Sequence, residues 1–260
     1  MKLKEITSIL EEWAPLEYQE NYDNSGLILG DPETKIRSAL LTLDSTEDVV
    51  EEAIKKGANL IIAHHPILFG EIKQLNGKNY IERTIIKAIK NDIAIYAFHT
   101  NLDSVINGVN SKISDKLNLV NRSILKKRQE NNKVGSGIIG ELKSPMKEMD
   151  FLNLIKKEFK AGSVRYTSLL NKDVLRVAVC GGSGSFLLKD AIKEKADVFV
   201  TSDFKYHQYF DAENKILIAD IGHYESEICI QQLIYDYLNE KITTFTLHFS
   251  EVNTNPINYL

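Results

Sequence analysis

Cysteine is scarce in this sequence, with only Cys180 and Cys229 among 260 residues. These two residues indicate no disulfide framework and exclude a Cys-x-x-Cys metal site. Long apolar runs are also missing. None approaches the ~20 residues that a membrane span needs, and the first residues lack the apolar core of a signal peptide. We therefore expect a cytoplasmic protein without a membrane partner.

An excess of positive charge is absent as well. The 36 acidic residues outnumber the 32 basic ones, and the net charge of -4 argues against a nucleic-acid surface. What remains is an ordinary globular composition, with 43% hydrophobic and 26% charged residues. The length is sufficient for one large domain or two small ones.

Short apolar runs alternate with amphipathic helical patterns along the chain. Residues 38–43, 60–63, 93–98, 175–180 and 216–221 are typical of buried strands, whereas 3–13, 46–56, 81–90 and 150–159 suit helices. This alternation predicts an α/β fold with mostly parallel sheets. The polar stretch 126–132 indicates a boundary. We predict a first α/β half over 1–126, completed by 230–260, and a second over 127–229.

The two halves contain similar segments, which suggests an internal duplication. Residues 53–65 align without gaps on residues 191–203, and each copy runs from a helix end through an apolar strand into polar residues. The polar ends are His64-His65 in the first copy and Ser202-Asp203 in the second. The alternative is chance similarity between two βαβ units, because this pattern recurs in unrelated α/β folds.

Two consecutive histidines, His64 and His65, follow the apolar run Leu60–Ala63 and precede Pro66. Ligands of open α/β sheets bind at the carboxyl ends of strands, which is where these imidazoles are expected. At a bend before proline the two rings could reach two neighbouring metal ions. The alternative is that one ring is buried and hydrogen-bonded while the other is exposed.

Two further polar clusters follow predicted strands. His99 and Asp103 follow one, while His223 and Glu227 follow another and lie four residues apart, on one face of a helix. The imidazoles of His64, His65 and His223 and the carboxylates of Asp103 and Glu227 give five ligand groups. Three imidazoles and two carboxylates suit two adjacent divalent ions, with one bridging carboxylate and open positions. A nitrogen and oxygen set without thiolate fits Zn, Fe, Mn or Co. We predict such a site between the two halves, although His–Glu pairs of this spacing are mostly solvated surface.

Other polar residues allow more than one interpretation. His99 could orient Asp103 or be structural, and Asp44 could hydrogen-bond to a ligand or water. Lys205 and His207 could bind an anionic substrate or form a solvated turn. The glycine-rich stretch 181–184 lacks the lysine of a GxxxxGK phosphate loop, yet such a turn can still accept an anion.

Taken in order, the motifs resemble those of the NIF-three-like dinuclear-metal proteins, also called GTP cyclohydrolase 1 type 2 homologues. The motifs are Tyr22–Leu27, Ala63–Pro66, His99–Asp103, Thr201–His207, Gly222–Glu227 and Asn255-Pro256. The resemblance implies a metal pair held by His64, His65, Asp103, His223 and Glu227, with Glu227 as the bridge. It also implies a ring-shaped homohexamer whose sites face an inner cavity. Ser202 departs from the glycine that family members commonly carry.

These observations predict a metal-dependent hydrolase. Two metal ions can lower the pKa of a water molecule and clamp an oxyanion. His99 and His207 are then the nearest acid–base groups outside the ligand set. The resemblance suggests a nucleotide substrate such as GTP, opened by hydrolysis. The alternative is a non-enzymatic metal-binding scaffold, metal chaperone or regulatory protein.

Overall fold

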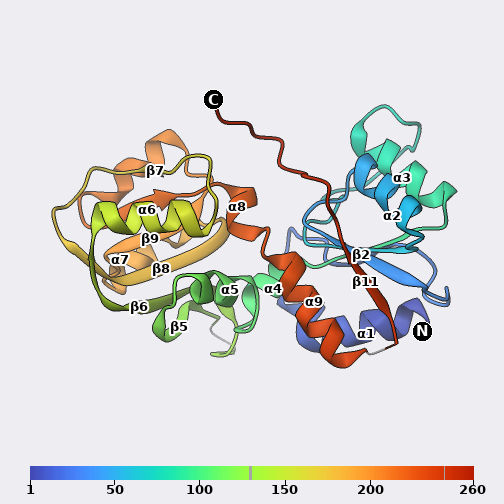
Figure 1. Cartoon of the computed structure of the whole chain (residues 1–260), viewed down its shortest axis with the longest axis horizontal. Coiled ribbons are helices and arrows are strands. Elements are labelled where there is room, and N and C mark those ends of the chain that lie inside the picture. The colour runs from blue at the N-terminus through green and yellow to red at the C-terminus, as the bar shows by residue number, and fades with distance from the viewer. Residues whose placement is uncertain (129–130, 243) are drawn as a thin grey trace. The chain divides into compact units, whose positions relative to one another are not determined.

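The computed structural model describes residues 1–128, 131–242 and 244–260, and it divides into two compact units. The first unit contains Met1–Leu102 and Ile230–Asn255, and the second contains Asp103–Cys229 and Pro256–Leu260. Each unit has its own sheet, of five strands in the first and six in the second (Figure 1). The predicted α/β class is confirmed.

The first boundary differs from the predicted one. Residues 103–126 belong to the second unit, because β5 (Val120–Lys127) pairs antiparallel with β6 (Gly135–Lys147) in the second sheet. Residues 126 and 127 of the polar stretch 126–132 are themselves part of β5, while residues 129 and 130 lie outside the described part. The polar composition at the end of this strand resembled a domain boundary.

The sheet of the first unit has the strand order β1-β4-β3-β2-β11 and is parallel except at β1. Its strands are β1 (Gly26–Leu29), β2 (Ser38–Thr42), β3 (Leu60–Ala63), β4 (Ala94–Ala97) and β11 (Thr246–Phe249). Every residue of the three central strands is buried, which explains their continuous apolar runs. β11 brings the last part of this unit back beside β2.

Helices cover both faces of this sheet (Figure 1). They are α1 (Leu3–Trp13), η1 (Leu16–Tyr18), α2 (Glu47–Lys56), α3 (Tyr80–Lys90) and α9 (Ile230–Lys241). α2 and α3 lie on one face, and α1 and α9 lie on the other, where Trp13 stacks on Tyr237 at 4.4 Å. Thr46 caps α2 by accepting from the Val49 amide, and Gly57 ends the helix in the left-handed region, at φ 68°.

The sheet of the second unit is mixed, with the order β5-β6-β8-β9-β10-β7. Its further strands are β7 (Arg165–Tyr166), β8 (Asp173–Ser183), β9 (Val198–Ser202) and β10 (Leu217–Asp220). Only β8, β9 and β10 run parallel to one another. The helices are α5 (Val109–Lys116), α6 (Glu148–Glu158), η2 (Ser185–Leu187), α7 (Leu188–Lys193), η3 (Tyr206–Ala212) and α8 (His223–Glu227). The short helix α4 (Thr100–Ser104) carries the chain from the first unit into the second.

Four strands repeat in the two sheets. The order β1-β4-β3-β2 in the first has the counterpart β7-β10-β9-β8 in the second, with the same parallel and antiparallel neighbours. The aligned segments 53–65 and 191–203 end on the equivalent strands β3 and β9. A common strand order is what an internal duplication requires.

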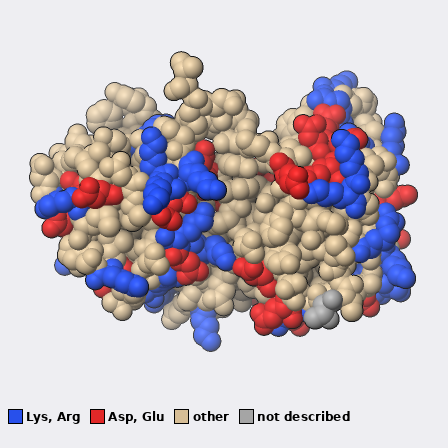
Figure 2. Space-filling view, viewed as in Figure 1, with Lys and Arg blue, Asp and Glu red and all other residues tan. Residues whose placement is uncertain are grey.

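Charged side chains of both signs are mixed on the face seen in Figure 2, over each of the two units. Among the described residues, no helix combines the length and the apolar character that crossing a membrane would require.

Candidate metal centre

His64 and His65 lie directly beyond β3, as predicted. Both of their backbone amides donate to the carbonyl of Leu43, at 3.1 and 2.9 Å, and this fixes the chain beside the end of β2. The two imidazole centroids are 4.8 Å apart. His64 is fully buried and His65 is half-buried. The strand end therefore presents two imidazoles side by side.

Asp44 orients the ring of His65. The His65 Nδ1 lies 2.7 Å from Asp44 Oδ1, while the Thr254 hydroxyl donates to Asp44 Oδ2 at 2.6 Å. Burial raises the pKa of Asp44, but hydrogen bonds from His65 and Thr254 and the attraction to His65 outweigh burial and lower that pKa overall. A charged carboxylate on Nδ1 makes Nε2 the nitrogen that binds a metal, as in carboxylate–histidine–metal triads.

A third imidazole, that of His99, completes this cluster of the first unit. Its centroid is 5.5 Å from the rings of both His64 and His65. His99 Nδ1 lies 2.6 Å from Asp23 Oδ1, and Asp23 also accepts from the amide and hydroxyl of Thr100. Burial raises the pKa of Asp23, and the hydrogen bonds from His99 and Thr100 lower it by more. Asp23 is thus a carboxylate that holds His99.

The second unit carries a cluster on α8. His223 Nε2 lies 3.0 Å from Glu227 Oε2, so the four-residue spacing does place both side chains on one helix face. His223 Nδ1 lies 2.7 Å from Asp203 Oδ2. Burial lowers the pKa of His223, but attraction to Glu227 and hydrogen bonds to Asp203 and Glu227 raise it to about 11. The metal-free protein therefore holds an imidazolium between two carboxylates.

Gly182 leaves the space that Glu227 occupies. It has a φ of +60°, and a Cβ built there would lie 2.3 Å from Glu227 Oε1. The Gly182 amide donates to the Ser226 hydroxyl at 2.9 Å, and the Ser202 hydroxyl donates to the Gly182 carbonyl at 2.5 Å. The glycine-rich stretch therefore supports α8, and its amide hydrogen bonds are used internally. Ser202, the departure from the family pattern, is part of that support.

Asp103 is the first residue of the second unit and lies in α4. Its carbonyl accepts from the Asn110 side chain at 3.1 Å. Burial, followed by the negative charges of Asp103 and Glu227, raises the pKa of the buried Cys180 thiol. Both carboxylates are thus within electrostatic range of one thiol. A thiol that is kept protonated is a poor metal ligand, which leaves the carboxylates as the acidic ligands here.

The ring neighbours of His207 differ from those of the other predicted site histidines. It is exposed at the start of η3, and its ring neighbours are Tyr206 at 5.2 Å and Phe210 at 6.3 Å. The neighbouring Lys205 is exposed, and its amide donates to the Gln208 side chain at 2.8 Å. This segment is a capped turn whose aromatic rings pack on one another.

Two residues that hold the histidines were missed in the sequence. Asp23 is 76 positions from His99, and no local pattern joins them. Asp203 was visible as the counterpart of His65 in the aligned segments, and its position after β9 was the available signal. Among the described residues, His64, His65 and Glu227 are a group of ligand types that could hold a metal ion.

The sequence matches the Duf34/NIF3 (NGG1p interacting factor 3) family over residues 1–256. A Clostridium perfringens protein named GTP cyclohydrolase 1 type 2 homolog is 37% identical over 243 residues, which are 93% of each chain. A protein of the same name from Streptococcus pneumoniae is 32% identical, with 100% of both chains covered.

Solved structures have the same fold. The crystal structure of a Bacillus cereus protein related to NIF3 has a TM-score of 0.95 at 26% identity and covers 100% of this chain and 99% of that chain. A Staphylococcus aureus hypothetical protein has a TM-score of 0.93 at 31% identity, with the same coverage of both chains. The resemblance inferred from the motifs is confirmed, and the chain belongs to the Duf34/NIF3 family.

Proposed function

We propose that this protein is a metal-dependent hydrolase with two divalent ions per chain. The observation that carries the proposal is the orientation of two proposed ligands, His65 and His223, each with a carboxylate oxygen 2.7 Å from its Nδ1, while His99 has the same kind of pair at 2.6 Å. Histidines that bind metals are typically oriented in this way, and chance surface histidines are not. The proposed ligands are His64, His65, Asp103, His223 and Glu227.

The donor set is consistent with such ions. It offers imidazole nitrogens and carboxylate oxygens, which suit Zn, Fe, Mn or Co. Both cysteine thiols are buried, and burial raises the pKa of each of them, so neither competes as a ligand. The space above Gly182 that Glu227 fills supports a bridging role for this carboxylate, since its position is sterically defined.

Bound divalent ions would supply Lewis acidity to a hydrolytic reaction. The chain itself would supply proton transfer through His99. Asp23 accepts from His99 Nδ1, which leaves Nε2 to take up or deliver a proton beside His64 and His65. His207 is the second candidate for acid–base chemistry, although its contacts are with aromatic rings.

The relatives named GTP cyclohydrolase 1 type 2 homolog point to a nucleotide such as GTP as the substrate class. We propose hydrolytic opening of its base, with release of formate. The family resemblance further supports a ring-shaped homohexamer in the cytoplasm. Both assignments are part of the proposal, and the substrate is tested by formate release, separately from metal binding.

The test measures metal content and formate release from GTP for the purified full chain and for the double variant with His65→Ala and Glu227→Ala. We expect the double variant to lose most of its metal and all turnover. His248→Ala is the matched control, because it removes an imidazole from β11, outside the three carboxylate–histidine pairs. Full metal content in the double variant would overturn the ligand assignment.

The same measurement separates hydrolysis from the non-enzymatic alternative. Metal that is bound by the unaltered chain and lost from the double variant, without formate release from GTP in either, would remove the hydrolysis of this substrate. The protein would then act on another substrate or be a metal-binding scaffold, metal chaperone or regulatory protein.

A further inference from the structure

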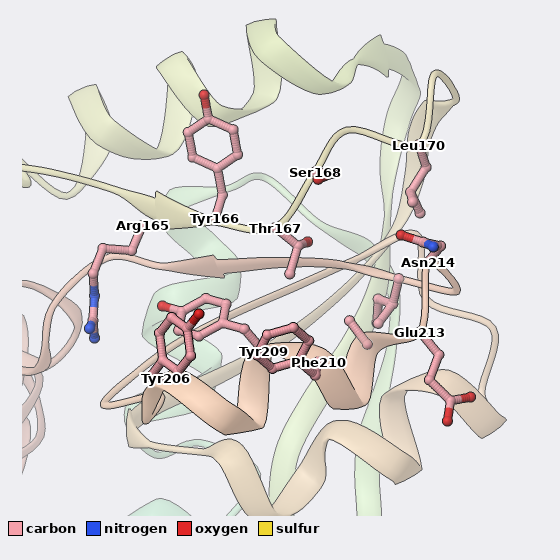
Figure 3. A pocket seen from close by; sticks show the side chains of 12 residues that line it. Arg165, Tyr166, Thr167, Ser168, Leu170, Tyr206, Tyr209, Phe210, Glu213 and Asn214 are labelled. Carbon is pink, nitrogen blue, oxygen red and sulfur yellow. The ribbon is translucent and has the colours of Figure 1, made fainter.

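The second unit contains a cavity of about 530 Å³ that the metal chemistry does not use. It lies between β7 with the residues that follow it and the helical segment η3 (Figure 3). Cavities that bind small organic ligands are typically about 300–1,000 Å³ and combine apolar walls with a few polar groups. This cavity therefore has the size of a ligand site.

One wall of the cavity is aromatic. Tyr206, Tyr209 and Phe210 line it from η3, and Figure 3 shows their rings along the same side, below β7. Tyr206 is 74% exposed and Phe210 is 65% exposed. Exposed rings gathered on a concave surface are unusual in a protein without a partner for them, and they provide flat surfaces on which another ring can stack.

One end of the cavity is cationic. Arg165 is 57% exposed along its side chain, and its NH2 group donates to the buried Asp220. The guanidinium carbon lies 5.9 Å from the ring centre of Tyr209. Within the described residues, the Nε and NH1 groups of Arg165 have no hydrogen-bond acceptor. The guanidinium is thus fixed in place by Asp220 while it keeps donors for an anionic group.

The opposite end carries an amide, and a hydroxyl lies between the two ends. Figure 3 shows Asn214 at the end away from Arg165, with Thr167 between them. The Thr167 hydroxyl accepts from the Ile218 amide at 3.1 Å and can still donate. Donors and acceptors at this end suit the polar edge of a heterocyclic base, which hydrogen-bonds in its plane.

We propose that this cavity binds a nucleotide, with its base stacked on the aromatic wall and its phosphate on Arg165. The inference goes beyond the proposed function: with its phosphate toward α8 the nucleotide keeps its base at the far end of the cavity, so this is a nucleotide site separate from the proposed hydrolytic centre. The Arg165 end of the cavity is connected to the start of α8 through Asp220. Asp220, the partner of Arg165, accepts from the Gly222 amide at 3.2 Å, and Gly222 precedes His223. A phosphate on Arg165 would thus lie toward the start of α8.

The test is calorimetric titration of the full chain with GMP in EDTA, which removes metal as a phosphate ligand. We expect saturable binding that weakens about tenfold in Phe210→Ala, the loss typical of one stacking ring. Phe186→Ala is the matched control. It removes an exposed phenylalanine of the same unit that does not line the cavity, and it should leave the GMP affinity unchanged.

Two further measurements test the phosphate contact. Guanosine should bind more weakly than GMP, and ribose 5-phosphate should not bind measurably. Arg165→Lys keeps a cation beside Asp220 but loses the planar guanidinium, so it should lower the affinity for GMP to that for guanosine. Equal binding of GMP by the unaltered chain and Phe210→Ala, or no saturation at all, would overturn the proposal.

These outcomes are distinct from failure of the proposed function. If metal-loaded protein releases formate from GTP while Phe210→Ala binds GMP as the unaltered chain does, the hydrolase survives and the cavity is excluded. If GMP binding depends on Phe210 and Arg165 but no turnover of GTP occurs, the cavity is a nucleotide site and the hydrolysis of GTP is excluded.

Discussion

The two units repeat a four-strand arrangement but carry different chemistry at the strand ends. The first unit gathers three imidazoles, those of His64, His65 and His99, within 5.5 Å of one another by ring centroid. The second unit offers the carboxylates of Glu227 and Asp203 around a single imidazole. Of the proposed ligands, the two in the first unit, His64 and His65, are therefore nitrogen donors, whereas the second unit adds two carboxylates, those of Asp103 and Glu227, to a single imidazole.

The difference affects what each unit must do before it binds a metal. In the first unit, the Nδ1 of His65 is committed to Asp44, so the ring already has the orientation that a metal requires. In the second unit, His223 is protonated in the metal-free protein and lies against Glu227, the proposed bridge. The first unit is preorganised, whereas the second must lose a proton and an ion pair.

The largest expected effect is that of Gly182→Ala in the second unit. A methyl group at φ +60° is strained, and it would lie 2.3 Å from Glu227 Oε1. We expect this substitution to displace Glu227, to lower the free energy of unfolding by about 2–4 kcal/mol, and to reduce the metal bound per chain. Urea unfolding and elemental analysis would measure the two losses.

Gly57→Ala in the first unit is the matched control for Gly182→Ala. Gly57 has a similar φ of +68°, but a Cβ built there has nothing within 4 Å. It should cost only about 1 kcal/mol of stability and leave the metal content unchanged. If both alanine variants lose stability equally and keep their metal, crowding at Glu227 is not what the glycine provides.

The next largest expected effect is that of removing the carboxylate that orients a histidine. The comparison asks whether this loss lowers the metal affinity equally in the two units. Asp44→Asn and Asp203→Asn keep the size of each side chain but remove its charge beside His65 and His223. We expect each to weaken metal binding by about 10–100-fold, as the loss of an orienting group typically does. Competition with a metal-sensitive dye would measure the affinities. An unchanged affinity in either variant would show that this carboxylate does not orient a ligand.

The two units should also differ in the number of protons that metal binding releases. Because the pKa of His223 is about 11 in the metal-free protein, near pH 8 a metal must displace its proton. The metal affinity should rise with pH, and calorimetry in buffers of different ionisation enthalpy should detect about one proton released. His223→Gln should abolish this release. Release that persists in that variant would assign the proton to another group.

The same pKa predicts how the stability of the metal-free protein depends on pH. The folded pKa of His223 is above the ordinary value of 6.5. Its contribution to the free energy of unfolding is therefore fully present below about pH 6.5 and is lost as the pH rises toward 11. Metal-free His223→Gln should lack this alkaline loss in a series of urea titrations.

Much of the fold could be predicted from local sequence patterns. The buried strands around 60–63 and 216–221 are mainly apolar, because every residue of β3 and β10 is buried. The parallel order of these strands follows from the alternation with helices. The predicted boundary separated β5 from β6, because their antiparallel pairing depends on contacts that periodicity does not encode.

The candidate site was predictable to the extent that its residues lie at strand ends. His64 and His65 directly follow β3, and His223 follows β10 after two residues, so topology alone brings them to sheet edges. The pairing of Asp23 with His99 joins residues 76 positions apart, and that of Asp44 with Thr254 joins residues 210 positions apart. Such pairs depend on the folded chain and are visible only in the structure.

The smallest expected effect concerns Asp23 in the first unit. Its carboxylate accepts from His99 and from Thr100, and these bonds lower its pKa despite burial. A lowered pKa stabilises the fold above the ordinary value of about 3.9, and this stability is lost as the pH falls further. Asp23→Asn should therefore reduce the free energy of unfolding by about 1–2 kcal/mol at pH 7 and by less near pH 3.

Urea titrations at the two pH values would measure the effect of Asp23→Asn. Glu52→Gln is the matched control within the same unit. Glu52 accepts from Ser250 and Glu251, has a lowered pKa, and lies outside the histidine clusters. Both variants should lose stability, but only Asp23→Asn should also lower turnover, because only Asp23 holds the imidazole proposed to transfer protons. Equal turnover in the two variants would make Asp23 a purely structural carboxylate and remove His99 from the chemistry.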